Sequence, residues 1–94
     1  MITRIVRLTF RAEEAWRFPE VFRATTPKQV ALGCRSNRMF QEPGKPEVWV
    51  TISEWESHAA LEGYRTSELF YGTWAQLKPY FAAPAEAYSL EEVQ

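Results

Sequence analysis

The segment Glu47–Trp55, EVWVTISEW, constrains the fold more than any other part of the chain. Its residues alternate between two sides, with Val48, Val50 and Ile52 on one and Trp49, Thr51, Ser53 and Trp55 on the other. Alternation with a period of two is the pattern of a β-strand. Because both sides are half-apolar, we expect this strand to lie in a sheet whose two faces are both covered.

The rest of the chain supplies three more strands and two helical regions. Strand patterns occupy Ile2–Phe10, Cys34–Gln41 and Ala85–Val93, and helical spacing runs over 12–32 and 57–79, with Ser57 and Ser67 as N-caps. We expect the first helix to kink at Pro19 or to begin just before it, Pro27 to start a new turn, and Gly33 to stop that turn. The order strand, helix, strand, strand, helix, strand predicts an α+β fold of the ferredoxin-like split βαβ type. Its four-stranded antiparallel sheet would carry helices on one face.

The side-chain pattern of the first strand predicts which face the helices cover. Ile2, Val6, Leu8 and Phe10 point one way, interrupted by Arg4, and should face the helices. We expect the uncovered face to carry Trp49, Met39, Trp55 and Tyr88 or their neighbours. Apolar surface of that kind usually marks an interface, so we expect a symmetric homodimer.

Length and charge exclude several classes of protein. At 94 residues the chain is expected to form one domain, 1–94, and its net charge of -1 argues against binding to nucleic acid. One cysteine and one histidine cannot build a zinc site, so no metal is expected. No apolar run is long enough to span a membrane. The alternating N-terminus offers no signal-peptide core, so we expect a cytoplasmic protein.

Two stretches resemble a known family. The segments TISEWESHAALEGYRTSELFYGTWAQLKPYF (51–81) and AEAYSL (85–90) are similar to the antibiotic biosynthesis monooxygenase family of dimeric α+β barrels. The resemblance implies a homodimer in which two sheets pack face to face, with a pocket between sheet and helices in each subunit. It also implies oxygenation of a small aromatic or quinol-like substrate without a cofactor.

The haem-degrading branch of that family provides a specific comparison. Its pattern has an asparagine on the first strand, a tryptophan at the end of the third, and an iron-ligating histidine on the last helix. The tryptophan matches Trp55, but the other two positions hold Val6 and Trp74. Since tryptophan cannot act as the axial ligand, the resemblance does not extend to haem, and no cofactor is expected.

Several side chains are candidates for the site, each with a structural alternative. Trp55 and Trp74 could bound a substrate pocket or simply fill the core, and the same holds for Phe22, Tyr64 and Phe70. Arg7 and Asn37 are expected to face the same way as Trp49 and Trp55. They could orient a carbonyl or phenolate oxygen, or make hydrogen bonds at a dimer interface.

His58 is the candidate general base, because histidine is the side chain whose unperturbed pKa lies near neutrality. Its position in the first turn after Ser57 is also typical of a solvent-facing residue. Two functions therefore stay open at this level. One is a cofactor-free monooxygenase, and the other is a non-enzymatic dimeric barrel that binds a small apolar ligand or acts as an interaction module.

Overall fold

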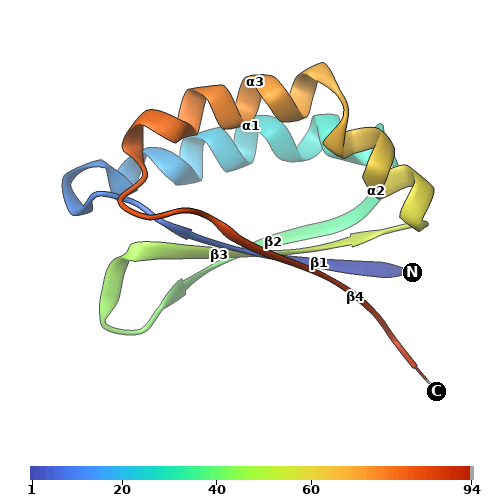
Figure 1. Cartoon of the computed structure of the whole chain (residues 1–94), viewed down its shortest axis with the longest axis horizontal. Coiled ribbons are helices and arrows are strands. Elements are labelled where there is room, and N and C mark those ends of the chain that lie inside the picture. The colour runs from blue at the N-terminus through green and yellow to red at the C-terminus, as the bar shows by residue number, and fades with distance from the viewer. Residues whose placement is uncertain (94) are drawn as a thin grey trace.

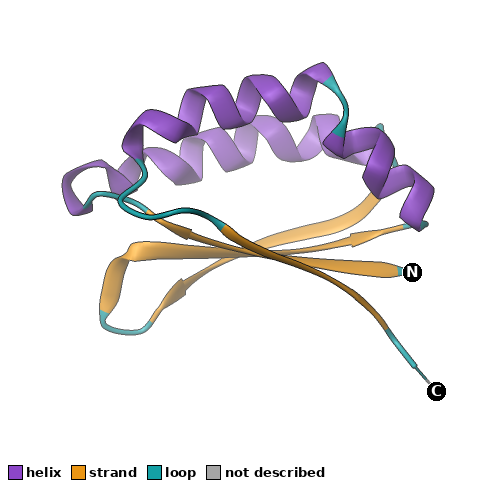
Figure 2. Ribbon diagram, in the orientation of Figure 1, coloured by secondary structure: helices purple, strands orange, loops and turns teal. Residues whose placement is uncertain are grey.

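All helices lie on one face of a single antiparallel sheet (Figures 1 and 2). The computed structural model describes residues 1–93, so Gln94, the last residue of the expected domain, lies outside the described part. The elements are β1 (Ile2–Thr9), the 3-10 helix η1 (Ala12–Arg17), α1 (Phe18–Val30), β2 (Cys34–Glu42), β3 (Lys45–Trp55), α2 (His58–Arg65), α3 (Glu68–Leu77), the 3-10 helix η2 (Lys78–Tyr80) and β4 (Glu86–Glu91). The strand order is β2-β3-β1-β4. This arrangement confirms the predicted α+β ferredoxin-like fold. Among residues 1–93, no helix has the length and apolar character to cross a membrane.

The register between β1 and β3 determines which side chains face the helices. Leu8 lies opposite Trp49, and Ile2 lies opposite Trp55. Directly opposed residues of an antiparallel pair project to the same face. The Trp49 indole Nε1 donates a 3.0 Å hydrogen bond to the Ala15 carbonyl oxygen of η1, which places this set on the helix side. The prediction that the even-numbered residues of the first strand face the helices is confirmed.

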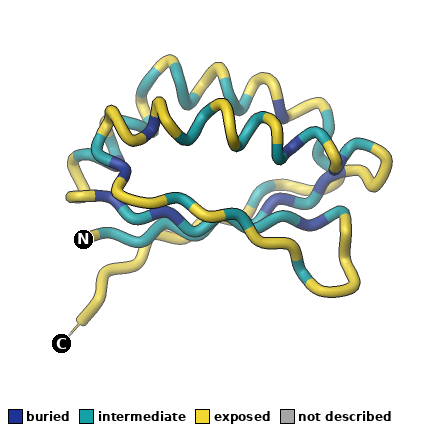
Figure 3. The backbone as a smooth tube through the Cα atoms, turned by 180° about the vertical axis from the view of Figure 1, so that it is seen from behind, coloured by how far each residue is buried: buried dark blue, intermediate teal, exposed yellow. Residues whose placement is uncertain are grey.

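The expected composition of the uncovered face was largely wrong. Trp49 and Trp55 face the helices, as does Met39, which lies opposite Thr51 in the register. The reason is that β3 is half-apolar on both sides, so its alternation does not say which side the helices take. Tyr88 does lie on the uncovered face, opposite Ile5. Figure 3 shows buried positions on both the strands and the helices, while β4 is exposed along its length.

The core consists of two clusters. The larger contains Leu8, Phe10, Ala15, Phe18 and Leu77, and the smaller contains Cys34, Trp55 and Leu61. A continuous series of ring contacts connects them, with centroid separations between 4.9 and 6.1 Å. In order, the rings are Trp55, Tyr64, Phe70, Trp74, Phe81, Phe10, Phe18 and Trp49. The rings therefore link the two clusters through β3, α2, α3 and α1, together with Phe10 and Phe81, which lie just after β1 and η2.

The ends of the helices follow the predicted signals, with one exception. Pro19 lies at the start of α1, and the Ser57 and Ser67 hydroxyls accept hydrogen bonds from the N–H groups of the first turns of α2 and α3. Pro27 was expected to start a new turn, but α1 continues through it to Val30. Proline removes only one hydrogen bond near the end of the helix, and this loss does not break the final turn. Gly33, with a φ of 102°, then ends the helical segment.

Candidate functional site

A cavity of about 80 Å³ lies between the sheet and the helical layer. It touches both core clusters and is lined by residues of β1, α1, β2, β3, α2 and α3. The lining residues are Arg4, Val6, Leu8, Phe18, Val21, Phe22, Thr25, Gln29, Asn37, Thr51, Ser53, Trp55, Tyr64, Arg65, Phe70, Thr73, Trp74 and Leu77. The position is the one in which this fold can enclose a small molecule away from water.

One wall of the cavity is aromatic. The Trp55 ring stacks on Tyr64 with centroids 4.9 Å apart and an angle of 24° between the rings. Tyr64 meets Phe70 edge-on at 5.4 Å, and Phe70 contacts Trp74 at 5.6 Å. These contacts fix the rings relative to one another, so the wall presents a preorganised apolar surface to a flat ligand.

Polar groups gather at the end of the cavity next to Trp55 and Tyr64, and several of them are paired with one another. The Asn37 amide Nδ2 donates a 2.6 Å hydrogen bond to Gln29 Oε1, and the Trp55 Nε1 donates a 3.0 Å bond to Ser53 Oγ. Burial raises the pKa of the Tyr64 phenol, and this effect outweighs the hydrogen bond with Gln29. Tyr64 is therefore a neutral phenol at physiological pH.

Two arginines contribute charge to the same lining. Arg4 Nη1 donates a 2.8 Å hydrogen bond to Ser89 Oγ, and Arg65 Nη1 pairs with Glu62 Oε1 at 2.9 Å. Burial lowers the pKa of Arg4, and the neighbouring Arg65 guanidinium lowers it further. Two buried atoms at this site, Arg65 Nε and Asn37 Oδ1, have no hydrogen-bond partner among the described residues.

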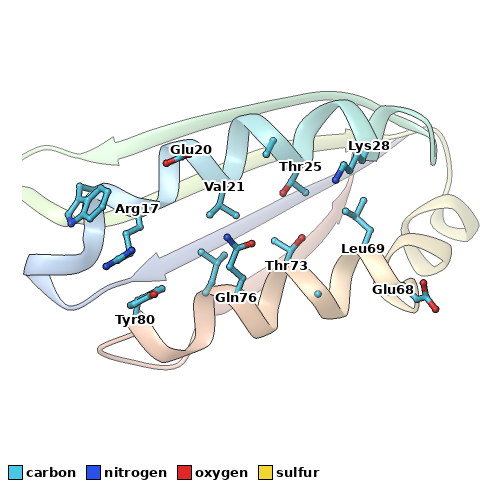
Figure 4. A pocket seen from close by; sticks show the side chains of 14 residues that line it. Arg17, Glu20, Val21, Thr25, Lys28, Glu68, Leu69, Thr73, Gln76 and Tyr80 are labelled. Atoms are coloured by element: carbon cyan, nitrogen blue, oxygen red, sulfur yellow. The ribbon is translucent and has the colours of Figure 1, made fainter.

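A second, larger hollow lies on the outside of the helical layer (Figure 4). It is a groove of about 530 Å³ between α1 and α3. At one end the Arg17 guanidinium lies 4.7 Å from the Trp16 ring centroid and 4.5 Å from that of Tyr80. The groove and the cavity share the lining residues Val21, Thr25, Thr73 and Leu77. A single layer of side chains therefore separates the outer groove from the inner cavity.

Sequence comparison identifies the family. The sequence profile described as antibiotic biosynthesis monooxygenase matches residues 1–75, which is more than half of the 94-residue chain. The chain belongs to the antibiotic biosynthesis monooxygenase family. The family resemblance seen in the sequence is thereby confirmed. No curated protein matches the chain.

Solved structures agree with antibiotic biosynthesis monooxygenase family membership at the level of the fold. A crystal structure of an antibiotic biosynthesis monooxygenase superimposes with a TM-score of 0.88 at 19% identity, covering 100% of both chains. Rv0793 from Mycobacterium tuberculosis gives 0.86 at 20% identity, covering 99% of this chain and 95% of its own. PA3566 from Pseudomonas aeruginosa gives 0.84 at 20% identity, covering 99% and 94%. At these identities the likeness establishes the shared fold.

The residues of this antibiotic biosynthesis monooxygenase family member do not fit haem. Trp74 lines the cavity from α3, at the position where the haem-degrading branch has its histidine, and an indole N–H is a donor that cannot ligate iron. The described lining contains no histidine, cysteine or methionine. The remaining candidate ligand is Tyr64, whose raised pKa disfavours the tyrosinate form.

Six residues that the sequence singled out are brought together at the cavity. These are Trp55, Trp74, Asn37, Phe22, Tyr64 and Phe70. Arg7 is not among them, and the expectation that it faces the same way as Asn37 and Trp55 was wrong. It lies opposite Val50, on the uncovered face, where it pairs with Glu42 at 2.7 Å and with Glu86 at 3.1 Å. These ion pairs, with Glu42 on β2 and Glu86 on β4, hold its guanidinium there.

His58 also lies outside the cavity. Its side chain is 70% exposed on the first turn of α2 and lies 3.9 Å from Glu62 Oε1. A general base has to reach the proton that it removes, through a direct hydrogen bond or one water. The structure therefore places His58 at an exposed position in the first turn of α2, which was the alternative to a catalytic role.

Sequence reasoning missed several polar residues of the lining, among them Arg4, Gln29, Ser53 and Arg65. Arg4 carried a usable signal, because a charged residue interrupts an otherwise apolar set on the helix-facing side of the first strand. Arg65 pairs with Glu62 within α2, and its guanidinium also borders the cavity.

Proposed function

We propose that this protein is a cofactor-independent monooxygenase that acts on a small aromatic or quinol-like substrate. The observation that carries the proposal is the aromatic-walled cavity with a polar end, found in a member of the antibiotic biosynthesis monooxygenase family. A flat substrate ring would lie against Trp55 and Trp74. Its oxygen substituents would then meet the polar groups around Asn37.

In such a reaction the substrate itself supplies the electrons. A ring carbon of the phenol exchanges its hydrogen for one oxygen atom of O₂ and becomes a carbonyl, as the phenol carbon does, and that hydrogen and the phenol proton leave with the other oxygen atom as water. The protein has to exclude water from the reacting anion and stabilise its charge. The apolar rings serve the first task, and the polar end serves the second.

The cavity is smaller than the roughly 300–1,000 Å³ of most ligand pockets, so side chains have to move before a substrate can bind. One layer of side chains, formed by Val21, Thr25, Thr73 and Leu77, lies between the cavity and the outer groove. We therefore propose that the substrate enters the cavity from the outer groove, between α1 and α3 (Figure 4).

Oxygen consumption tests this function. With a panel of dihydroxy-aromatic compounds, Trp74→Ala is expected to lower the rate by about tenfold or more, because it removes a wall that holds the ring and excludes water. The matched control is His58→Ala, whose side chain lies outside the cavity and whose loss should leave the rate within about twofold. An oxygen electrode measures both. Equal losses in the two variants would contradict the assignment of the cavity as the reaction site.

A non-enzymatic role is the second candidate, supported by the small volume of the cavity and by the lack of a general base in its described lining. In that case the barrel would bind a small apolar ligand or act as an interaction module. If no compound in the panel consumes oxygen while several quench the tryptophan fluorescence, the binding function replaces the enzymatic one.

We also propose a homodimer formed through the uncovered face of the sheet. Large apolar residues are exposed there, among them Phe40, Tyr88 and Leu90. Burying an exposed apolar surface of this kind against a second copy of the chain is more favourable than leaving it in contact with water.

Light scattering should accordingly give about twice the chain mass of 11.0 kDa. Tyr88→Glu, which adds a charge to the proposed interface, should shift the protein to the monomer. Tyr71→Glu is the matched control, because Tyr71 is similarly exposed but lies on α3. A wild-type protein that stays monomeric at micromolar concentration would refute the dimer.

A further inference from the structure

The polar end of the cavity carries positive charge without negative charge on its lining. Arg4 and Arg65 are the charged residues among those that line it in the described chain. We propose that the cavity binds its substrate as an anion, with the ionised oxygen accepting a hydrogen bond from Arg65 and lying in the field of Arg4. This inference rests on the proposed function, because it specifies the form of the substrate at that same site.

Arg65 has a buried donor that no other described residue engages. Its Nη1 is engaged by Glu62 Oε1 at 2.9 Å, while its Nε is buried and unpartnered among the described residues. A buried donor without a partner costs about 1–3 kcal/mol in a folded protein, and more for a charged group. An oxyanion in the cavity would satisfy this N–H with a charge-assisted hydrogen bond.

The two guanidinium groups are close enough to oppose each other's charge. Burial lowers the pKa of Arg4, Arg65 lowers it further, and Glu62 acts in the opposite direction. Glu62 is shared, because it pairs with Arg65 and also lies near His58. The other titratable groups here are Tyr64 and Cys34, and burial raises the pKa of both, so they stay neutral. Glu62 lies outside the lining and offsets part of the repulsion between the two arginines, and an anionic ligand in the cavity would offset more of it.

Asn37 adds a second requirement for the ligand. Its amide Nδ2 is used by Gln29, while Oδ1 is buried without a partner among residues 1–93. A free acceptor in the same cavity favours a ligand that also carries a hydroxyl group. The chemistry that satisfies both sites is an aromatic ring with one ionised oxygen and one hydroxyl group.

This form of the substrate is the one that the proposed reaction needs. An ionised phenol gives an electron to O₂ more readily than the neutral phenol does. A cationic site that favours the ionised form would raise its bound fraction at neutral pH, which is the role that preorganised charge plays in many enzymes. Arg4 and Arg65 would in this way replace the general base that the cavity lacks.

The experiment uses 4-nitrophenol, a single-ring phenol that ionises near neutral pH and turns yellow when it does. Bound to the wild-type chain, it should titrate about one pH unit below the free compound, a tenfold rise in the ratio of phenolate to phenol. Arg65→Gln and Arg4→Gln should each remove most of this shift, whereas Arg65→Lys, which keeps the charge, should retain part of it. Arg23→Gln is the matched control, because Arg23 is exposed on α1 and does not line the cavity.

Three results would overturn the inference. These are a bound probe that ionises at the same pH as the free compound or higher, a shift that survives in both glutamine variants, and no tryptophan quenching by the probe at any pH. Circular dichroism checks that each variant is folded, and if Arg65→Gln is not, Arg4→Gln carries the test. Nitrophenol binding requires no oxidation, so an anion site without oxygen uptake would refute the monooxygenase and leave this inference standing.

Discussion

Replacing Trp55 with alanine is expected to lower the free energy of unfolding by about 3–5 kcal/mol. Trp55 is 1% exposed, stacks on Tyr64 and donates a hydrogen bond to Ser53. The truncation would remove those contacts and enlarge a cavity that already exists beside the ring, where the neighbouring side chains cannot close the gap. Ser53 would also lose its partner inside the core.

Urea denaturation followed by circular dichroism measures this loss. Trp16→Ala is the matched control, because Trp16 is 64% exposed and its removal should change the free energy of unfolding by no more than about 0.5 kcal/mol. Similar losses in the two variants would mean that the ring at position 55 does not hold the sheet and α2 together. The Trp55 variant should also lose binding of 4-nitrophenol, because the Trp55 ring forms part of the aromatic wall of the cavity.

Gly33→Ala is expected to cost at least about 2 kcal/mol of stability. The φ of 102° at Gly33 is strained for any residue with a Cβ atom, and a Cβ placed there would lie 2.9 Å from the Cβ of Ala60 on α2. The Gly33 carbonyl also accepts a 3.1 Å hydrogen bond from the Glu56 N–H, so the backbone cannot relax freely. The turn between α1 and β2 is thus fitted closely against the start of α2.

The control for this position is Gly63→Ala. Gly63 lies in α2, has a helical backbone, and leaves open space where a Cβ would be added. Alanine should therefore raise the stability by about 0.5–1 kcal/mol, since it favours the helix. Thermal unfolding of the two variants should give shifts of opposite sign. A harmless Gly33 variant would show that the turn can be rebuilt without the left-handed residue.

The order of elements could be predicted because each has a strong local signal. Alternation marks β1 and β3, and serine caps mark α2 and α3. The faces of the sheet could not be predicted in the same way. In β3 both sides are apolar, and only the pairing of Leu8 with Trp49 and the hydrogen bond from Trp49 to η1 decide between them. These contacts join residues far apart in the sequence, so they cannot be recognised from the local pattern of side chains.

The candidate site was predictable to the same extent. Its aromatic residues follow from the family motif, which placed Trp55, Tyr64 and Trp74 together. Its charge could not be predicted, because Arg4 and Arg65 are 61 positions apart in the sequence (65 minus 4). Only the folded arrangement of β1 and α2 brings both side chains to the same cavity. Arg7 shows the opposite error. A displacement of one residue along a strand moves a side chain to the other face, and Arg7 opposes Val50 instead of Thr51.

The series of rings from Trp55 to Trp49 has a consequence for how the molecule comes apart. Each ring contacts the next, and the series passes through both core clusters. Neither cluster can therefore loosen without exposing aromatic surface in the other. The domain should unfold as one cooperative unit, with the environments of Trp55 and Trp49 changing together over a single transition.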